Sequence, residues 1–250
     1  MIRGRLLAAA LLVVGLQAQC SGGTPAAPAS APPGATPGTV EGGGVLFIGN
    51  SLTQANDLHL RVADVARDAG VALDVEAVVA PGFSLEDHLA SGAAAARIAS
   101  RRWSVVVLQQ GPSTLPESRE LLVRDARRFA LLSRAAGARP ALLVVWPIPG
   151  QRQADVSASY RAAAAAVDGL VLPAGEAWQA ALARDRSLRL TVADGFHPTP
   201  LGTYLAALTI HCALNGRLPP ASLDVERQRA GVALTAAQDQ ILRDAACAAR

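Results

Sequence analysis

Short runs of consecutive apolar residues, each ended by a turn, constrain the fold of this chain most strongly. The clearest runs are Val45–Ile48, Ser104–Leu108 and Ala141–Val145. Strands that are apolar at every position are buried on both faces, which is typical of a parallel sheet covered by helices. The sequence therefore predicts an α/β fold, a three-layer α/β/α sandwich whose crossover connections are right-handed.

Two further strands are expected at 73–79 and 170–172, which gives a five-stranded parallel sheet. Apolar residues at helical spacing lie between and after the strands. They predict helices at about 54–69, 85–99, 117–136, 154–167, 175–184, 200–214 and 235–248. The chain shows no internal repeat, and its 250 residues are enough for one large domain.

The N-terminus has the features of an export signal. Arg3 and Arg5 precede an apolar run from Leu6 to Ala18 that is too short to span a bilayer. Cys20 follows this run at the position of a lipid-anchored cysteine, but Gln19 stands where such signals normally have Gly, Ala or Ser. Cleavage near Ala18 without lipid attachment is the alternative. Either way, we expect an extracytoplasmic protein: secreted, periplasmic or lipid-anchored at the cell envelope.

The expected domain organisation follows from composition. Residues 1–20 are read as the signal peptide. Residues 21–44 consist almost entirely of Gly, Pro, Ala, Ser and Thr, so they cannot bury enough apolar surface to fold and are expected to form a disordered linker. Residues 45–250 then form the folded domain. The formal net charge is only +3, and the basic residues, all arginine, are scattered among acids. This pattern excludes a basic nucleic-acid-binding stripe.

Two cysteines remain in the folded domain, Cys212 and Cys247. In an oxidising compartment they could form a disulfide between two C-terminal helices. Two buried free thiols are an equally good interpretation of the sequence, because the spacing along the chain does not give the Cα separation that a disulfide needs.

The polar segments Gly49-Asn50-Ser51, Pro81–Ser84 and Gln109–Gly111 each follow a predicted strand. The carboxyl ends of parallel strands meet at one edge of the sheet, where open α/β folds bind ligands. Ser51 has two interpretations. It could cap the helix that follows, since serine is a favoured N-cap, or it could be a nucleophile beside backbone N–H groups that form an oxyanion hole.

A fourth polar segment, Asp194-Gly195-Phe196-His197-Pro198, precedes the helix expected at about 200. An aspartate three residues before a histidine can bind the imidazole Nδ1 within one loop and leave Nε2 free to accept a proton from serine. This spacing favours the nucleophile interpretation of Ser51, provided that the two segments meet in space.

These four segments, in this order, resemble the blocks of SGNH-type (GDSL-like) hydrolases. The resemblance covers Val45 to about Leu214. It implies a flavodoxin-like fold and ester hydrolysis through an acyl-enzyme, with no metal or cofactor. Carried over by position, Ser51 is the nucleophile, His197 the general base and Asp194 its orienting partner. The backbone N–H groups of Ser51 and Gly82 would be oxyanion donors.

The sequence departs from the family pattern at two places. Asn50 stands where the usual Gly-Asp-Ser has aspartate, and a Gln109-Gln110 pair stands where the third block has asparagine. A glutamine side-chain N–H can also serve as an oxyanion donor, and some carbohydrate acetylesterases of this kind have a similar Gln-Gly step. We expect Gln110 to be this donor, with Gln109 as the alternative.

We therefore expect an exported serine esterase that hydrolyses a small ester, such as an acetyl group on a carbohydrate. Two alternatives remain. An acyltransferase would use the same residues to transfer the acyl group to a carbohydrate hydroxyl. A non-catalytic cell-envelope binding module could also be built on this fold. The sequence contains neither a G-x-S-x-G elbow nor an H-E-x-x-H zinc motif, which argues against an ordinary α/β-hydrolase and a zinc site.

Overall fold

The structure is a computed structural model and describes residues 43–222, 228–229, 231 and 233–249. The expected signal peptide and residues 21–42 of the expected linker lie outside the described residues. The first strand begins at Gly44, one residue before the expected start of the domain. Within the described residues, none of the helices is long and apolar enough to cross a membrane.

Five parallel strands form one sheet in the order β2-β1-β3-β4-β5. This is the flavodoxin-like strand order, so the predicted fold class is confirmed. The strands are β1 (Gly44–Gly49), β2 (Asp74–Val79), β3 (Val105–Leu108), β4 (Arg139–Leu143) and β5 (Leu170–Leu172). In the register at the centre of the sheet, Phe47 of β1 pairs with Val107 of β3, and Val107 pairs with Ala141 of β4.

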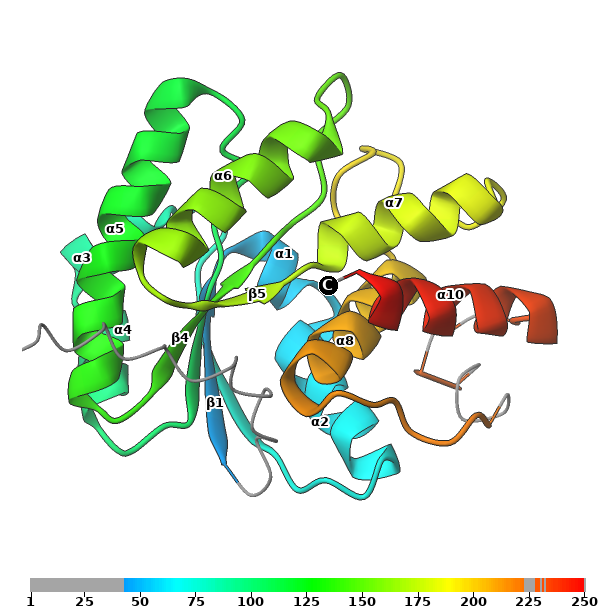
Figure 1. Ribbon diagram of the computed structural model, residues 1–250, viewed down its shortest axis with the longest axis horizontal. Coiled ribbons are helices and arrows are strands. Elements are labelled where there is room, and N and C mark those ends of the chain that lie inside the picture. Colours follow the sequence, from blue (N-terminus) through cyan, green and yellow to red (C-terminus); the bar gives the residue numbers. More distant parts are fainter. Residues whose placement is uncertain (1–42, 223–227, 230, 232, 250) are drawn as a thin grey trace, which may run out of the picture. The chain divides into compact units, whose positions relative to one another are not determined.

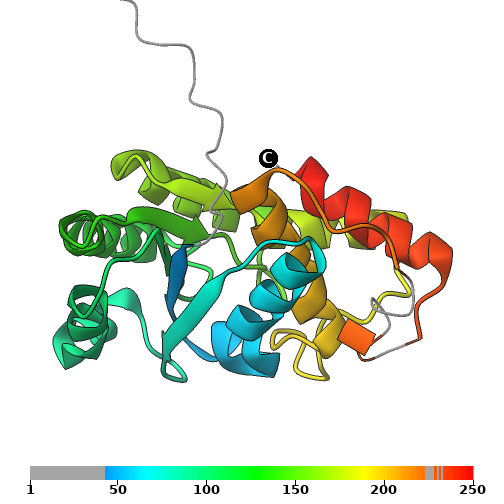
Figure 2. The same ribbon diagram turned by 90° about the horizontal axis from the view of Figure 1, so that it is seen from below.

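Helices cover both faces of the sheet (Figure 1). On one side, α3 (Leu85–Ser91), α4 (Ala93–Ala99) and α6 (Gln153–Ala166) all contact α5 (Pro116–Ala135). On the other side, α2 (Leu58–Asp68), α7 (Ala174–Arg184) and α10 (Ala236–Ala248) all contact α8 (Pro200–Asn215). Figure 2 shows α2 and α8 next to each other, beside the sheet. The predicted three-layer sandwich is thus present.

The core lies between these layers. Val45, Leu46, Phe47 and Ile48 of β1 have no exposed surface, and β3 is almost as deeply buried. Burying a large apolar side chain contributes about 1.5–3 kcal/mol, so the central strands are held rigidly. Their carboxyl ends therefore form a fixed edge on which loops can position reactive groups.

The structure differs from the predicted elements where the local backbone turns. The helix expected at 85–99 is divided at Gly92, which has a left-handed φ of 73° and caps α3. The helix expected at 54–69 is divided into α1 (Ser51–Gln54), η1 (Ala55–Asp57) and α2, because Asn56 and Asp57 are left-handed. Strand β4 begins at Arg139 and ends at Leu143, although the apolar run continues through the buried Val144 and Val145.

The C-terminal helices are linked covalently. Cys212 of α8 and Cys247 of α10 form a disulfide with a Cα–Cα distance of 5.6 Å. The sequence left open whether these cysteines form a disulfide or are two buried free thiols, and the structure contains the disulfide. It joins the helix that follows the histidine segment to the last helix of the domain.

Candidate active site

Ser51 is the first residue of α1 and lies directly beyond the end of β1. The residue that caps α1 is Asn50, whose side-chain Oδ1 accepts a hydrogen bond from the Leu52 N–H at 3.1 Å. The Ser51 hydroxyl is therefore not needed as a cap. Its Oγ lies 2.9 Å from Nε2 of His197, which is 146 residues further along the chain.

Asp194 shapes the loop that carries His197. Its Oδ1 accepts hydrogen bonds from the backbone N–H groups of Phe196 at 2.8 Å and His197 at 2.9 Å. Its Oδ2 accepts a hydrogen bond from Nδ1 of His197 at 2.6 Å. The N–H of Phe196 is the largest cause that lowers the pKa of Asp194 to about 2, followed by the side chain and N–H of His197. The carboxylate therefore stays ionised and directs Nε2 towards Ser51.

The histidine loop is fixed at several points. Within it, the Val192 N–H donates to the carbonyl oxygen of His197 at 2.9 Å. Trp146, directly beyond β4, donates its indole N–H to the carbonyl oxygen of Phe196 at 2.7 Å. Asn56 donates its side-chain amide to the carbonyl oxygen of Pro198 at 3.0 Å and to Thr203 Oγ1 at 2.9 Å. The loop is thus held against both β4 and the nucleophile segment.

Sequence analysis did not identify the role of Asn56. It adopts a φ of 52°, a conformation that asparagine accepts more easily than most residues. The only signal in the sequence was an asparagine inside a segment with helical spacing. That signal indicates a turn, and it does not indicate that the turn holds a loop about 140 positions away.

Gly82 lies in a turn that the sequence made recognisable. The Phe83 N–H donates to the carbonyl oxygen of Ala80 at 3.2 Å, with Pro81 second and Gly82 third in the turn. Gly82 has a φ of 75°, which matches a type II turn with proline and glycine at their preferred positions. This turn places the predicted oxyanion donor beyond the end of β2.

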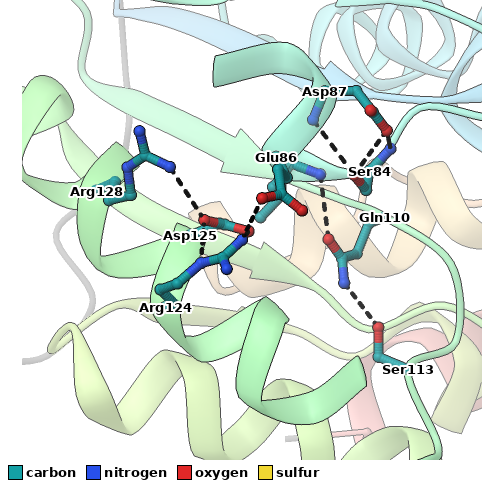
Figure 3. A network of polar contacts seen from close by, with 9 residues as sticks. Ser84, Glu86, Asp87, Gln110, Ser113, Arg124, Asp125 and Arg128 are labelled. Carbon is teal, nitrogen blue, oxygen red and sulfur yellow. Dashed lines mark hydrogen bonds and ion pairs between the residues drawn. The ribbon is translucent and has the colours of Figure 1, made fainter. Parts of the chain in front are cut away.

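The two neighbouring glutamines beyond β3 have different surroundings. Gln109 has no exposed surface, and its side-chain Oε1 accepts the Asn50 N–H at 2.9 Å. Gln110 is 6% exposed. Its Oε1 accepts the Leu85 N–H at 3.1 Å, and its Nε2 donates to Ser113 Oγ at 2.8 Å (Figure 3). Since an amide nitrogen carries two hydrogens, this bond uses one donor of Gln110.

A cavity of about 330 Å³ brings the three strand-end segments together. Asn50, Gly82 and Gln110 all line it, so residues that follow β1, β2 and β3 share one space. Much of the remaining lining is polar and includes Ser84, Ser113, Ser118, Glu86 and Asp125. Asp125 is buried and paired with Arg124 and Arg128 (Figure 3). Two of the expected oxyanion donors, Gly82 and Gln110, thus border the same cavity.

A larger cavity, of about 600 Å³, borders the histidine loop. Trp146 lines it, together with Gly195 of the loop. Trp178 lines it as well, and its ring stacks on that of Trp146 with centroids 3.6 Å apart. Both indoles are only 3% exposed, so they form a rigid wall.

Comparison with known proteins gives similarity at the level of structure. The sequence matches no family model and no curated protein. An SGNH hydrolase from Slackia heliotrinireducens is 26% identical, with a TM-score of 0.54 over 70% of this chain and 98% of that chain. A DUF4886 family protein from Bacteroides uniformis is 18% identical, with a TM-score of 0.66 over 82% of this chain and 93% of that chain.

An acetylxylan esterase from Geobacillus stearothermophilus is 13% identical, with a TM-score of 0.51 over 77% of this chain and 95% of that chain. The strand order, the strand-end segments and this set of similar structures agree with one another. By its fold and its strand-end segments the chain is similar to SGNH/GDSL-like hydrolases, a class of enzyme that acts on ester bonds.

Proposed function

We propose that the protein is an exported serine esterase that hydrolyses a small ester, an acetyl group on a carbohydrate, through an acyl-enzyme on Ser51. One observation carries this proposal. The Ser51 hydroxyl, the His197 imidazole and the Asp194 carboxylate form a continuous hydrogen-bonded chain of 2.9 Å and 2.6 Å. A serine is activated in this way when a neighbouring base can take its proton.

The first half of the reaction follows from this geometry. His197 Nε2 accepts the proton of Ser51 Oγ as Oγ bonds to the ester carbonyl carbon. Asp194 remains ionised and stabilises the imidazolium. The negative charge on the former carbonyl oxygen would be held by the N–H groups of Ser51 and Gly82 and by the side-chain amide of Gln110.

In the second half, the tetrahedral intermediate collapses and the C–O bond to the alcohol breaks. The imidazolium gives its proton to the departing alcohol and leaves an acyl-Ser51. Water then attacks the acyl carbon and gives a proton to His197. The bond from that carbon to Ser51 Oγ breaks as the imidazolium returns the proton to Oγ, and the carboxylic acid leaves. No group other than those of the chain, the ester and water takes part.

The acetylated-carbohydrate substrate is supported by the surroundings of the site. The cavity of about 330 Å³ that Gly82 and Gln110 border is small and carries serine hydroxyls and amides. Its small size suits an acetyl group better than a long acyl chain, and its few hydroxyls and amides can hydrogen-bond a carbohydrate. The acetylxylan esterase with the same fold gives a precedent for this kind of substrate.

Export is supported by two features. The apolar run near the N-terminus fits a signal peptide, and the disulfide between Cys212 and Cys247 fits an oxidising compartment. We propose an extracytoplasmic location on these grounds, with a lipid anchor on Cys20 as its membrane-attached form.

The test is hydrolysis of p-nitrophenyl esters of increasing chain length by the wild-type protein and by Ser51→Ala. We expect the acetate ester to be the best substrate and the variant to be at least 10³-fold slower. Acetylated xylo-oligosaccharides in the same assay test the carbohydrate substrate. Equal rates for the wild type and Ser51→Ala would contradict the proposal.

A further inference from the structure

The side chain of Asn50 contacts the turns that follow three different strands. Its Oδ1 accepts the Leu52 N–H of its own turn at 3.1 Å and Nε2 of Gln109 at 2.9 Å. Its Nδ2 donates to the carbonyl oxygen of Phe83 at 3.2 Å. A backbone N–H can only donate and a carbonyl oxygen can only accept, so these partners fix the orientation of the amide.

Gln109 uses its whole hydrogen-bonding capacity in the same network. Its Oε1 accepts the Asn50 N–H at 2.9 Å and the Thr53 hydroxyl at 2.8 Å. Its Nε2 donates to Asn50 Oδ1 at 2.9 Å and to the carbonyl oxygen of Gln110 at 2.6 Å. Both amide hydrogens are therefore committed, and Gln109 has no donor left for an oxyanion.

Gly49 permits this close approach. A Cβ atom at position 49 would lie 2.5 Å from Gln109 Oε1 and 2.5 Å from Thr53 Oγ1, both of them buried. Such contacts are too short for any side chain. The glycine before Asn50 thus leaves the space that the buried Gln109 and Thr53 side chains occupy.

We propose that Asn50 and Gln109 are positioning residues that act as one amide relay. The relay links the turn of Ser51 to the turn of Gly82 through the carbonyl oxygen of Phe83, and to the strand end of Gln110. It would set the distance between the oxyanion donors that the proposed function assigns, and it rests on that function. Asn50 and Gln109, which both depart from the family pattern, then act together in one hydrogen-bond network.

This proposal makes the aspartate of the usual Gly-Asp-Ser pattern harmful at position 50. An aspartate at position 50 still caps α1, because aspartate and asparagine are equally good N-caps. It cannot donate to the carbonyl oxygen of Phe83, however, and it would place a second acceptor against that oxygen. The turn of Gly82 would then lose its link to the turn of Ser51.

The experiment compares Asn50→Asp and Gln109→Glu with the wild type in p-nitrophenyl acetate hydrolysis. We expect kcat to fall at least ten-fold in both variants while KM stays within two-fold, because the relay acts on the transition state and not on substrate binding. Gln54→Glu is the matched control, since it adds the same charge at an exposed position three residues after Ser51. It should stay within two-fold of the wild type.

The outcomes separate this proposal from the proposed function. An active wild type with an Asn50→Asp variant that folds and has an unchanged kcat would overturn the positioning role alone. Asn50→Asp carries this test because it preserves the cap, even if Gln109→Glu does not fold. A wild type that does not turn over any ester would overturn the proposed function and the positioning role with it.

Discussion

At the scale of single residues, the site depends on which hydrogen bond each polar atom makes. Ser51 is free to face His197 because Asn50 caps the helix. Gln109 is buried and accepts a hydrogen bond from the nucleophile turn, whereas its neighbour Gln110 lines the cavity of about 330 Å³. The sequence placed both glutamines at the right strand end, but it could not assign their roles. That assignment depends on the directions in which adjacent side chains leave a strand end.

Asp194→Asn tests the orientation of the histidine. Its side-chain oxygen could still accept the N–H groups of Phe196 and His197, so the loop would be kept. Its NH₂ would, however, donate to His197 Nδ1 and shift the imidazole hydrogen to Nε2, which then could not accept the proton of Ser51. We expect kcat to fall by about 10⁴-fold, measured with p-nitrophenyl acetate.

Asp185→Asn is the control for this substitution. Asp185 accepts the Ser187 N–H at 2.8 Å in a similar local turn; it is partly exposed, and its other carboxylate oxygen accepts from Gln238. We expect this variant to keep full activity. An Asp194→Asn enzyme that keeps more than a tenth of the wild-type kcat would contradict the role of Asp194. Because the pKa of Asp194 is lowered to about 2, the wild-type carboxylate stays ionised at any pH used in this comparison.

At the scale of elements, the strands and most helices followed from the pattern of apolar residues, because parallel strands and amphipathic helices leave strong periodic signals. The breaks within helices could not be predicted from this pattern. Gly92 could have been tolerated inside one long helix, and the left-handed Asn56 is held by contacts with Pro198 and Thr203. Such breaks depend on partners that are distant in the sequence.

Helix α8 contains a buried histidine that makes the stability of the domain depend on pH. His211 has no exposed surface, and within the described residues its Nε2 has no hydrogen-bond partner. Burial, together with the charge of Arg217, lowers its pKa to about 4. Between pH 6.5 and 4 the unfolded chain therefore binds a proton that the folded protein does not, and stability falls as the pH falls.

His211→Leu should remove this dependence. We expect the free energy of unfolding of the wild type to fall by about 2–3 kcal/mol more than that of the variant when the pH is lowered from 7 to 4.5. Urea unfolding at both pH values measures the difference. All other titrating groups are the same in the two proteins, so the leucine variant serves as the reference for their effect on stability. An equal loss of stability in both proteins would show that His211 does not titrate in this range.

At the scale of the whole molecule, the parallel sheet gathers groups that are distant in the sequence. Ser51, Gly82 and Gln110 lie near the ends of three strands that are adjacent in the sheet, and the loop before α8 brings His197 to Ser51. The strand order made the first grouping predictable. The approach of His197 and the closure of the disulfide could not be derived, because both depend on how helices pack on the sheet.

The account as a whole requires that Ser51 is an activated nucleophile. Reaction of the folded wild-type protein with a serine-directed organophosphonate, followed by peptide mass spectrometry, tests this most directly. We predict a single phosphonate on the peptide that contains Ser51 and none on Ser51→Ala. A wild-type protein that remains unlabelled, or that is labelled on a different serine, would contradict the account.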